Sequence, residues 1–235
     1  SEFTVHFNNR DLLNGLLEKI GMEDDAATVL RSLDKLPKIG AERVREELES
    51  LSGASTTQAS EILALADLTG SNDDIVAALP PIVGDSPTAV AGIAAITRVL
   101  SGVRASGVPE KRINLDVSIA RGLAYYTGTV FETFLDDLPG IGSVCSGGRY
   151  DDLASLYTKQ RLPGIGGSLG VDRLIAAMEE LGMAGRFSAT AQVFIPLFDG
   201  ERIDEYLALA ERLRKEGLSV ELYPEKRKLG AQLKY

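Results

Sequence analysis

RGLAYYTGTVFETF, residues 121–134, is the stretch that decides how this chain folds. Its second half is rich in β-branched and aromatic residues, which predicts a β-strand. Its first half places Arg121 four residues before the adjacent pair Tyr125 and Tyr126. An arginine offers a planar set of donors to a carboxylate or phosphate, and a tyrosine can pack its ring while its hydroxyl lines a pocket. Packed tyrosines and a surface arginine on an edge strand would leave the same pattern, so both interpretations stay open here.

The composition indicates a globular protein. The 235 residues are 44% hydrophobic and 25% charged, and the formal net charge of −9 opposes nonspecific binding to nucleic acid. We find no apolar run approaching the roughly 18–20 residues of a membrane span, and no pattern of a secretory signal. The single cysteine, Cys145, cannot form an internal disulfide. We therefore expect a cytoplasmic protein without membrane association.

The order of patterns along the chain predicts an α+β fold. Residues 3–9 alternate apolar and polar side chains, as a strand does, and helical spacing follows up to Gly21. Residues 22–110 have helical periodicity and predict four or five helices, with breaks that include Gly40 and the PPIVGDSP segment.

Strand patterns separated by hairpin-length connections return after residue 111. We expect them to form one antiparallel sheet with residues 3–9, and the helix 171–181 to pack against that sheet. Residues 191–224 show a strand–helix–strand pattern, which predicts the start of a separate α/β domain.

The first glycine-rich segment after the tyrosine pair is CSGGRYDDL, residues 145–153. It places Gly147 and Gly148 shortly before Tyr150, which is typical of a strand that another group approaches closely. A glycine turn with a surface Arg–Asp pair is the alternative.

The second glycine-rich segment is PGIGGSLGVDRLIAAM, residues 163–178, which runs from glycines through Gly170 into a helix that carries Arg173. It is not a dinucleotide-binding G-x-G-x-x-G, because Leu169 stands where the third glycine is required. An arginine in the first turn of this helix can reach a nucleotide phosphate, and an arginine on a solvated helix face is the alternative.

Together and in this order, the segments resemble the histidyl-tRNA synthetase family. RGLAYYTG is similar to its signature R-G-L-[DE]-Y-Y-T-G, SGGRYDDL to a second family block, and GIGGSLGVDRL to motif 3 of class II aminoacyl-tRNA synthetases. The resemblance covers essentially the whole chain. It implies a class II antiparallel sheet with flanking helices (residues 1–21 and 111–185), an all-helical insertion (22–110), and a partial anticodon-binding domain (190–235).

The resemblance also implies a reaction, in which ATP activates histidine to histidyl-adenylate and the histidyl group passes to tRNA-His. Arg121 would be catalytic and would contact the histidine carboxylate and the α-phosphate. The histidine pocket would further contain Tyr125, Tyr126, Tyr150, Gly147 and Gly148, and ATP would meet Arg173 and Gly170.

The family uses Mg²⁺ with ATP, but no metal-ligand cluster can be recognised in the sequence. The run Lys226–Arg227–Lys228 is the candidate tRNA contact, with a solvated turn as the alternative. A second candidate is a patch of Arg98, Arg104, Lys111 and Arg112. The full-length protein would be a homodimer.

The chain departs from the family pattern in two ways. Ala124 stands where the family has an acid. Motifs 1 and 2 are not recognisable, so we expect an incomplete fragment with little activity of its own. A non-catalytic relative, such as the regulatory subunit of ATP phosphoribosyltransferase, and a fragment with a purely structural role are the alternatives. If the synthetase interpretation is right, Arg121, Tyr126, Tyr150 and Arg173 line one cleft.

Overall fold

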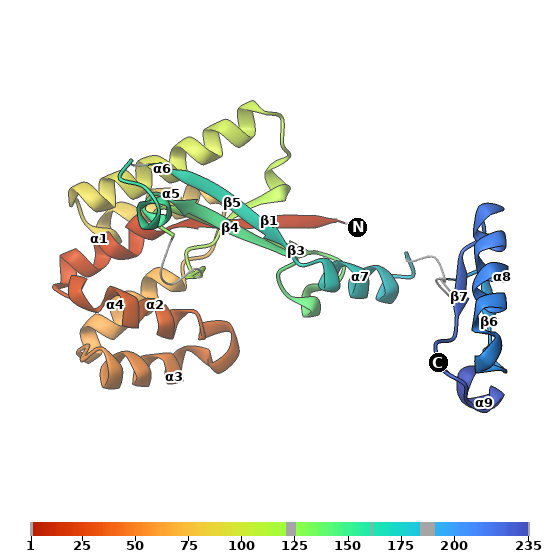
Figure 1. The fold of residues 1–235 in the computed structure, drawn as a ribbon. Helices are drawn as coiled ribbons and strands as arrows, with labels where there is room; N and C mark the ends of the chain where they lie inside the picture. Colours follow the sequence, from red (N-terminus) through yellow and green to blue (C-terminus); the bar gives the residue numbers. More distant parts are fainter. Residues whose placement is uncertain (1, 121–125, 161, 184–190, 235) are drawn as a thin grey trace. The chain divides into compact units, whose positions relative to one another are not determined.

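The computed structural model describes residues 2–120, 126–160, 162–183 and 191–234. The chain divides into two compact units, Ser1–Ala177 and Met178–Tyr235 (Figure 1), which we call unit 1 and unit 2 and describe separately.

Unit 1 contains a five-stranded sheet with the strand order β2-β1-β3-β4-β5. Three of its four pairings are antiparallel, whereas β1 and β2 run parallel. The prediction of a wholly antiparallel sheet is therefore wrong at this edge. A connection as long as the helical segment between β1 and β2 can return the chain to the end where it started, and a parallel pair needs such a connection. The strands are β1 Phe3–Asn9, β2 Ile113–Leu115, β3 Thr129–Leu135, β4 Cys145–Tyr150 and β5 Gly164–Leu169.

Six helices of unit 1 lie between β1 and β2, and five of them fall in the predicted helical block. They are α1 Arg10–Ile20, α2 Ala26–Leu33, α3 Leu36–Leu51, α4 Thr56–Ala66, α5 Asn72–Val83 and α6 Pro87–Ala105. In Figure 1 they gather around one end of the sheet, and α7, Val171–Glu180, lies near the other. The α7 side chains Leu174 and Ala177 pack with Leu135 and Val144 of the sheet region, as expected.

Local sequence explains most helix boundaries. Asn9, Ser71 and Ser86 each accept a hydrogen bond from the first turn of the following helix, and Gly21 ends α1 in the left-handed conformation. The expected break at Gly40 is a kink inside α3, at φ 80°. The expected break at PPIVGDSP, residues 80–87, lies in the second half of this segment, because α5 continues through its prolines to Val83 and α6 begins at Pro87.

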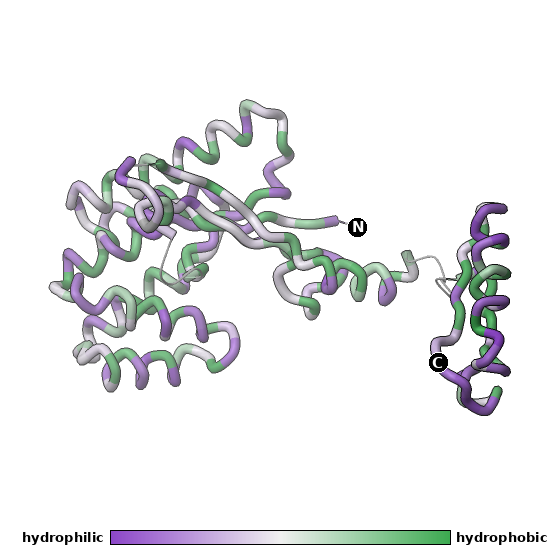
Figure 2. Tube along the Cα trace, in the orientation of Figure 1, coloured by the Kyte–Doolittle hydropathy of each residue, from purple (hydrophilic) through white to green (hydrophobic). Residues whose placement is uncertain are grey.

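The two faces of the sheet differ in chemistry. On one face a row of paired positions crosses all five strands, and this row consists of Leu115, Phe7, Phe131, Gly147 and Gly167. Phe7 and Leu115 are buried in the same core as α1 and α6, and Phe131 packs against it. In Figure 2, α3 alternates hydrophilic and hydrophobic residues along its length, as befits a helix that buries Val44 and Leu48.

Helices α1 and α6 cross unusually closely. A Cβ on Gly15 would lie 2.6 Å from the Cβ and 2.7 Å from the Cα of Ala89, and a Cβ on Gly92 would lie 3.0 Å from the Cβ of Asp11. Within the described residues α6 also meets the length and composition of a membrane span, contrary to the sequence analysis. Its buried side chains belong to the core that it shares with α1.

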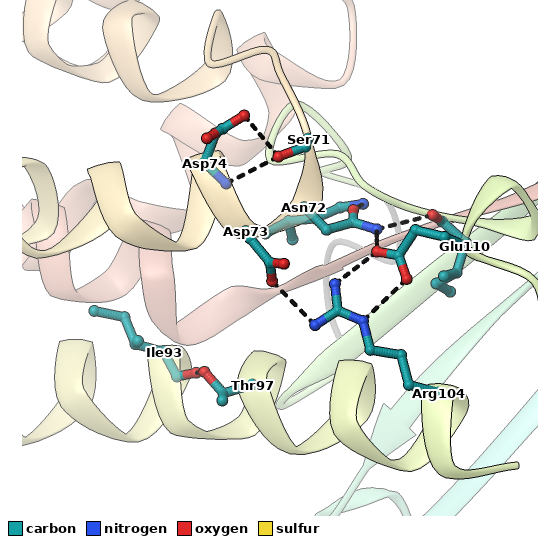
Figure 3. Close-up of polar contacts among 10 residues, drawn as sticks. Ser71, Asn72, Asp73, Asp74, Ile93, Thr97, Arg104 and Glu110 are labelled. Atoms are coloured by element: carbon teal, nitrogen blue, oxygen red, sulfur yellow. Dashed lines mark hydrogen bonds and ion pairs between the residues drawn. The ribbon is translucent and has the colours of Figure 1, made fainter.

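A polar network fastens β2 to the helices (Figure 3). The buried amide of Asn72 accepts a hydrogen bond from the Leu115 backbone N–H at 2.6 Å and donates to the Ile113 carbonyl at 3.1 Å and to Glu110 at 2.9 Å. Arg104 donates to both carboxylate oxygens of Glu110, at 2.6 and 2.9 Å, and to Asp73 at 3.0 Å. The hydrogen bonds from Arg104 and then Asn72 lower the pKa of Glu110 to about 2.

Unit 2 has the predicted strand–helix–strand order. Strand β6, Val193–Ile195, pairs in parallel with β7, Val220–Leu222, and α8, Ile203–Lys215, connects them. The short helix α9, Leu229–Gln232, contributes the buried Gln232, whose amide accepts from the backbone N–H of Leu197 and donates to its carbonyl.

The close crossing of α1 and α6 makes Gly15 sensitive to the smallest enlargement. We expect Gly15→Ala to lower the free energy of unfolding by about 1–3 kcal/mol, because the new methyl meets the Ala89 backbone rather than a movable side chain. Gly102→Ala is the matched control within α6: its Cβ meets nothing within 4 Å, so it should stabilise the chain by up to ~1 kcal/mol. Urea unfolding measures both, and a neutral Gly15→Ala would contradict the close crossing.

The Arg104–Glu110 pair predicts a specific acid sensitivity. The pKa of Glu110 falls from 4.5 to about 2 on folding, so its contribution is complete above the unfolded pKa and is lost as the pH falls towards the folded value. The difference in Tm between the original chain and Glu110→Gln should therefore shrink steadily between those two pH values. Glu46→Gln, on the exposed surface of α3, controls for the change in net charge. A difference that stays constant down to about pH 2 would show that Glu110 is not ionised by this pairing.

Candidate functional site

The second face of the sheet carries polar side chains at positions where the first face carries its core. One row of paired positions crosses the strands with only polar residues, and it consists of Asn114, His6, Glu132, Ser146 and Ser168. We call these five residues the polar row. Glu132 is 6% exposed, so a carboxyl group lies buried in the middle of this face. Burial of a carboxyl among polar neighbours is a common property of binding and catalytic sites.

Glycines and aromatic rings shape the next part of this face. Gly148 of β4 pairs with Gly166 of β5. A Cβ on Gly148 would lie 2.9 Å from the Tyr126 ring, and one on Gly166 would lie 3.1 Å from the Tyr150 hydroxyl oxygen. The two tyrosine rings therefore rest on the same glycine pair from the same side. The predicted histidine-binding residues Tyr126, Tyr150 and Gly148 come together here.

Gly147 faces the other side of the sheet. Its Cβ would overlap the Gly166 carbonyl oxygen and would lie 2.7 Å from the Gly167 Cα. The Phe131 ring lies against Gly147 and Gly167 on that face. The predicted Gly147 thus shapes the site only indirectly, by letting β4 and β5 approach.

Arg173 lies near the opposite end of β4. Its guanidinium donates from Nη1 to the Ser143 carbonyl at 2.6 Å, just before β4 begins. It lines a cavity of about 530 Å³ together with Ser146, Ser168 and Gly170, and a second cavity of about 350 Å³ together with Glu132 and Asp116. Both predicted ATP-binding residues, Arg173 and Gly170, therefore border space that the polar row also borders.

The described residues include part of the predicted cleft. Arg121 and Tyr125 lie outside the described residues, and so does Ala124. Tyr126 and Tyr150 lie at one end of β4 and Arg173 at the other, which a six-residue strand separates by about 17 Å. A single cleft containing all of them would have to run along the whole strand, over the Gly148–Gly166 pair and the polar row.

Asp116 accepts several hydrogen bonds at the edge of this face. It accepts hydrogen bonds from His6 Nδ1 at 2.8 Å, from the Ser118 hydroxyl at 2.5 Å and from the Ser118 backbone N–H at 3.1 Å. Burial acts to raise the pKa of Asp116, but the hydrogen bonds from His6 and Ser118 outweigh it and hold this pKa below its ordinary value. Asp116 is therefore a carboxylate, and the His6 proton sits on Nδ1.

Several of the predicted basic contacts have intramolecular partners. Arg227, between Lys226 and Lys228, donates to Glu225 at 2.8 Å, which raises its pKa. Arg104 pairs with Glu110 and Asp73, and Arg112 pairs with Glu2. No group of three or more His, Cys, Asp or Glu side chains that could hold a metal gathers in the described part of the chain.

Sequence reasoning missed the polar row. The alternation in residues 3–9 placed His6 and Asn8 on one side of a strand, but nothing in the order of residues paired that side with Glu132, Ser146 and Ser168. Pairing across strands is a tertiary property that only the register reveals.

A sheet with a glycine-rich strand running into a helix that carries an arginine is typical of the catalytic domains of class II aminoacyl-tRNA synthetases. The family model described as histidyl-tRNA synthetase matches residues 1–174. The chain belongs to the histidyl-tRNA synthetase family.

Relatives agree with this assignment. The chain is 56% identical over 233 residues to the histidine–tRNA ligase of Rhodopirellula baltica, which covers 99% of this chain and 53% of that protein. It is 45% identical over 242 residues to that of Xanthomonas campestris, with 100% and 51% covered. The crystal structure of histidyl-tRNA synthetase from Nostoc sp. PCC 7120 superposes with a TM-score of 0.74 at 36% identity, covering 100% of this chain and 55% of that one. The chain thus spans about half the length of the relatives it matches.

The contact between Tyr150 and β5 gives a prediction for the site. A methyl group in Gly164→Ala would overlap the Tyr150 ring, with its Cζ atom only 2.9 Å away, so the ring must leave its place on the strand. We expect a large change in the NMR ring resonances of Tyr150 and a loss of about 1–3 kcal/mol of stability. Gly140→Ala, where a Cβ meets nothing within 4 Å, should change neither. Unchanged Tyr150 resonances in Gly164→Ala would show that the ring does not lie on β5.

Proposed function

We propose that this chain carries the histidine- and ATP-binding part of a histidine–tRNA ligase. The observation that supports this most is the pair of tyrosine rings, Tyr126 and Tyr150, resting on the Gly148–Gly166 pair beside the polar row with its buried Glu132. Tyr126 belongs to the segment that carries the family signature. A pocket built from rings and hydroxyls suits a small, flat, polar side chain such as imidazole.

In the proposed first step, a carboxylate oxygen of histidine attacks the α-phosphorus of ATP. The bond from that phosphorus to the oxygen that bridges it to the β-phosphate breaks, and pyrophosphate leaves. Positioning and neutralisation of charge promote such a transfer. Arg121 would contact the carboxylate and the developing charge, and Tyr125 and Tyr126 would orient the imidazole. Arg173 and Gly170 would bind ATP.

The second substrate and the assembly are also part of the proposal. In the second step the histidyl group passes to the terminal ribose of tRNA-His, and the exposed Lys226 and Lys228 are the candidates for RNA contacts. Mg²⁺ would enter with ATP. The full-length enzyme would be a cytoplasmic homodimer. Unit 1 leaves Ile165 and Leu169 of the edge strand β5 69% and 64% exposed, which is compatible with further chain or a second subunit at this edge.

Histidine-dependent exchange of pyrophosphate into ATP tests the proposal. We expect a chimera, in which this chain replaces the aligned 233-residue segment of the Rhodopirellula baltica enzyme, to catalyse the exchange. The chain alone should be at least several hundred-fold slower, because it spans only about half the length of that enzyme. Loss of even one positioned donor to the reacting groups typically costs about 10²–10³ in rate. Exchange by the isolated chain within tenfold of the chimera would contradict this division of the chemistry.

Arg173→Ala in the chimera tests the nucleotide side of the site. It should raise the KM for ATP or lower kcat by a combined factor of about 10²–10³, because its guanidinium borders the cavities next to the polar row. Arg212→Ala, an exposed arginine on α8, controls for the lost charge. A chimera that binds histidine but exchanges no pyrophosphate would favour a non-catalytic relative instead.

A further inference from the structure

Asn8 makes an unusual set of contacts for a strand residue. Its side chain is 6% exposed, and its Nδ2 donates to two backbone carbonyls, those of Val117 at 3.1 Å and Ile119 at 3.0 Å. An amide nitrogen has two protons, so both are used. Because carbonyls only accept hydrogen bonds, these partners also settle which end of the amide faces them. Asn8 thus bridges alternate carbonyls of one segment.

That segment, residues 116–120, continues directly from the end of β2 without belonging to a strand. Its first residue donates its backbone N–H to the Phe7 carbonyl at 2.9 Å, and Asp116 receives the His6 hydrogen bond described above. Further along, hydrogen bonds from the side chain of Asn8 take the place of backbone hydrogen bonds between the strands. After the backbone pairing has ended, the side chains of His6 and Asn8 therefore hold this irregular segment on strand β1.

Contacts also hold the chain on the far side of residues 121–125. The Thr127 backbone N–H donates to the Arg149 carbonyl at 2.8 Å, and the Thr127 hydroxyl accepts from the Asp151 N–H at 3.1 Å. The Gly128 carbonyl accepts from the Arg10 N–H at 3.1 Å. Two described segments are thus anchored: residues 116–120 to β1 by Asn8, and residues 127–128 to β4 and α1.

We infer that Asn8 is a positioning residue for histidine activation, acting through residues 117–120 on Arg121, the next residue in the sequence. The inference rests on the proposed function. Asn8 touches no substrate; it acts by holding the carbonyls of Val117 and Ile119. A misplacement of about 1 Å of a catalytic group can cost ~10² in rate. Loss of the bridge also leaves two buried carbonyls without this donor.

The test uses Asn8→Leu in the chimera, which keeps the branched shape and the number of side-chain heavy atoms and removes both donors. Asn72→Leu is the matched control: Asn72 is equally buried, at 6% exposed, and also bridges backbone groups, but it holds β2 and Glu110. We expect Asn8→Leu to lower kcat for exchange by about 10² while the KM for ATP stays within about threefold, since Arg173 lies at the other end of β4. Asn72→Leu should lower Tm comparably and change kcat by less than about fivefold.

Equal losses of kcat in the two variants would overturn the inference, because the effect would then follow stability alone. If Asn8→Leu fails to fold, Asn8→Ser decides. This variant keeps one donor, and we expect its kcat to fall by at least about tenfold, but by less than the ~10² expected when both donors are removed. A kcat for Asn8→Ser equal to that of the unsubstituted chimera would overturn the inference as well.

A second measurement does not depend on activity. Hydrogen exchange of the 235-residue chain should become at least tenfold faster at residues 118–120 in Asn8→Ser, with no such change at these residues in Asn72→Leu. An inactive unsubstituted chimera would defeat the proposed function, and hydrogen exchange would then decide alone whether Asn8 orders the segment. Unchanged exchange at residues 118–120 would remove the positioning role in either case.

Discussion

The absence of Cβ atoms where β4 meets β5 is the constraint on which the rest of unit 1 depends. A side chain at Gly147 would overlap the neighbouring strand, and one at Gly148 would meet the Thr129 carbonyl oxygen at 2.8 Å. Because these positions are bare, aromatic rings lie directly against both surfaces of the sheet: Phe131 on the core side, and Tyr126 and Tyr150 on the polar side. The glycines thus allow a thin sheet in which a hydrophobic core and a polar pocket are separated by a single layer of backbone.

That separation explains how one small sheet can serve both stability and chemistry. The core face is covered by α1 and α6, whose close crossing leaves little freedom for either helix, and by the helices that pack around them. The polar face remains accessible, with the buried Glu132 at its centre and His6 and Asp116 at its edge. A carboxyl group in such surroundings is tolerated because polar neighbours line the same face, and a rigid core beneath keeps those neighbours in place.

Much of this architecture could be predicted, and the failures have physical causes. Alternation identified β1, helical spacing and Gly21 marked α1, and the change of pattern after residue 111 marked the return to strands. The three-residue strand β2 was too short to show its direction, so its parallel pairing was missed. The break between α5 and α6 falls within the predicted segment PPIVGDSP, but the two prolines did not mark its position, because α5 continues through them to Val83. His6 and Asp116 lie far apart in sequence, and only the sheet register brings them together. The roles of all the predicted site residues stay predictions, and Arg121 and Tyr125 also lie outside the described residues.

The parallel pairing of β1 and β2 has a consequence for how the chain reaches its fold. These neighbours are joined through residues 10–112, so the pair closes one of the longest loops within the sheet. Closing a flexible loop of that length costs entropy that grows with the logarithm of its length, and contacts so distant in sequence slow folding. Helices α1 to α6 shorten the effective loop if they form and pack first. The sheet edge that carries Asp116 is thus expected to assemble late, after the helical core has brought its two strands together.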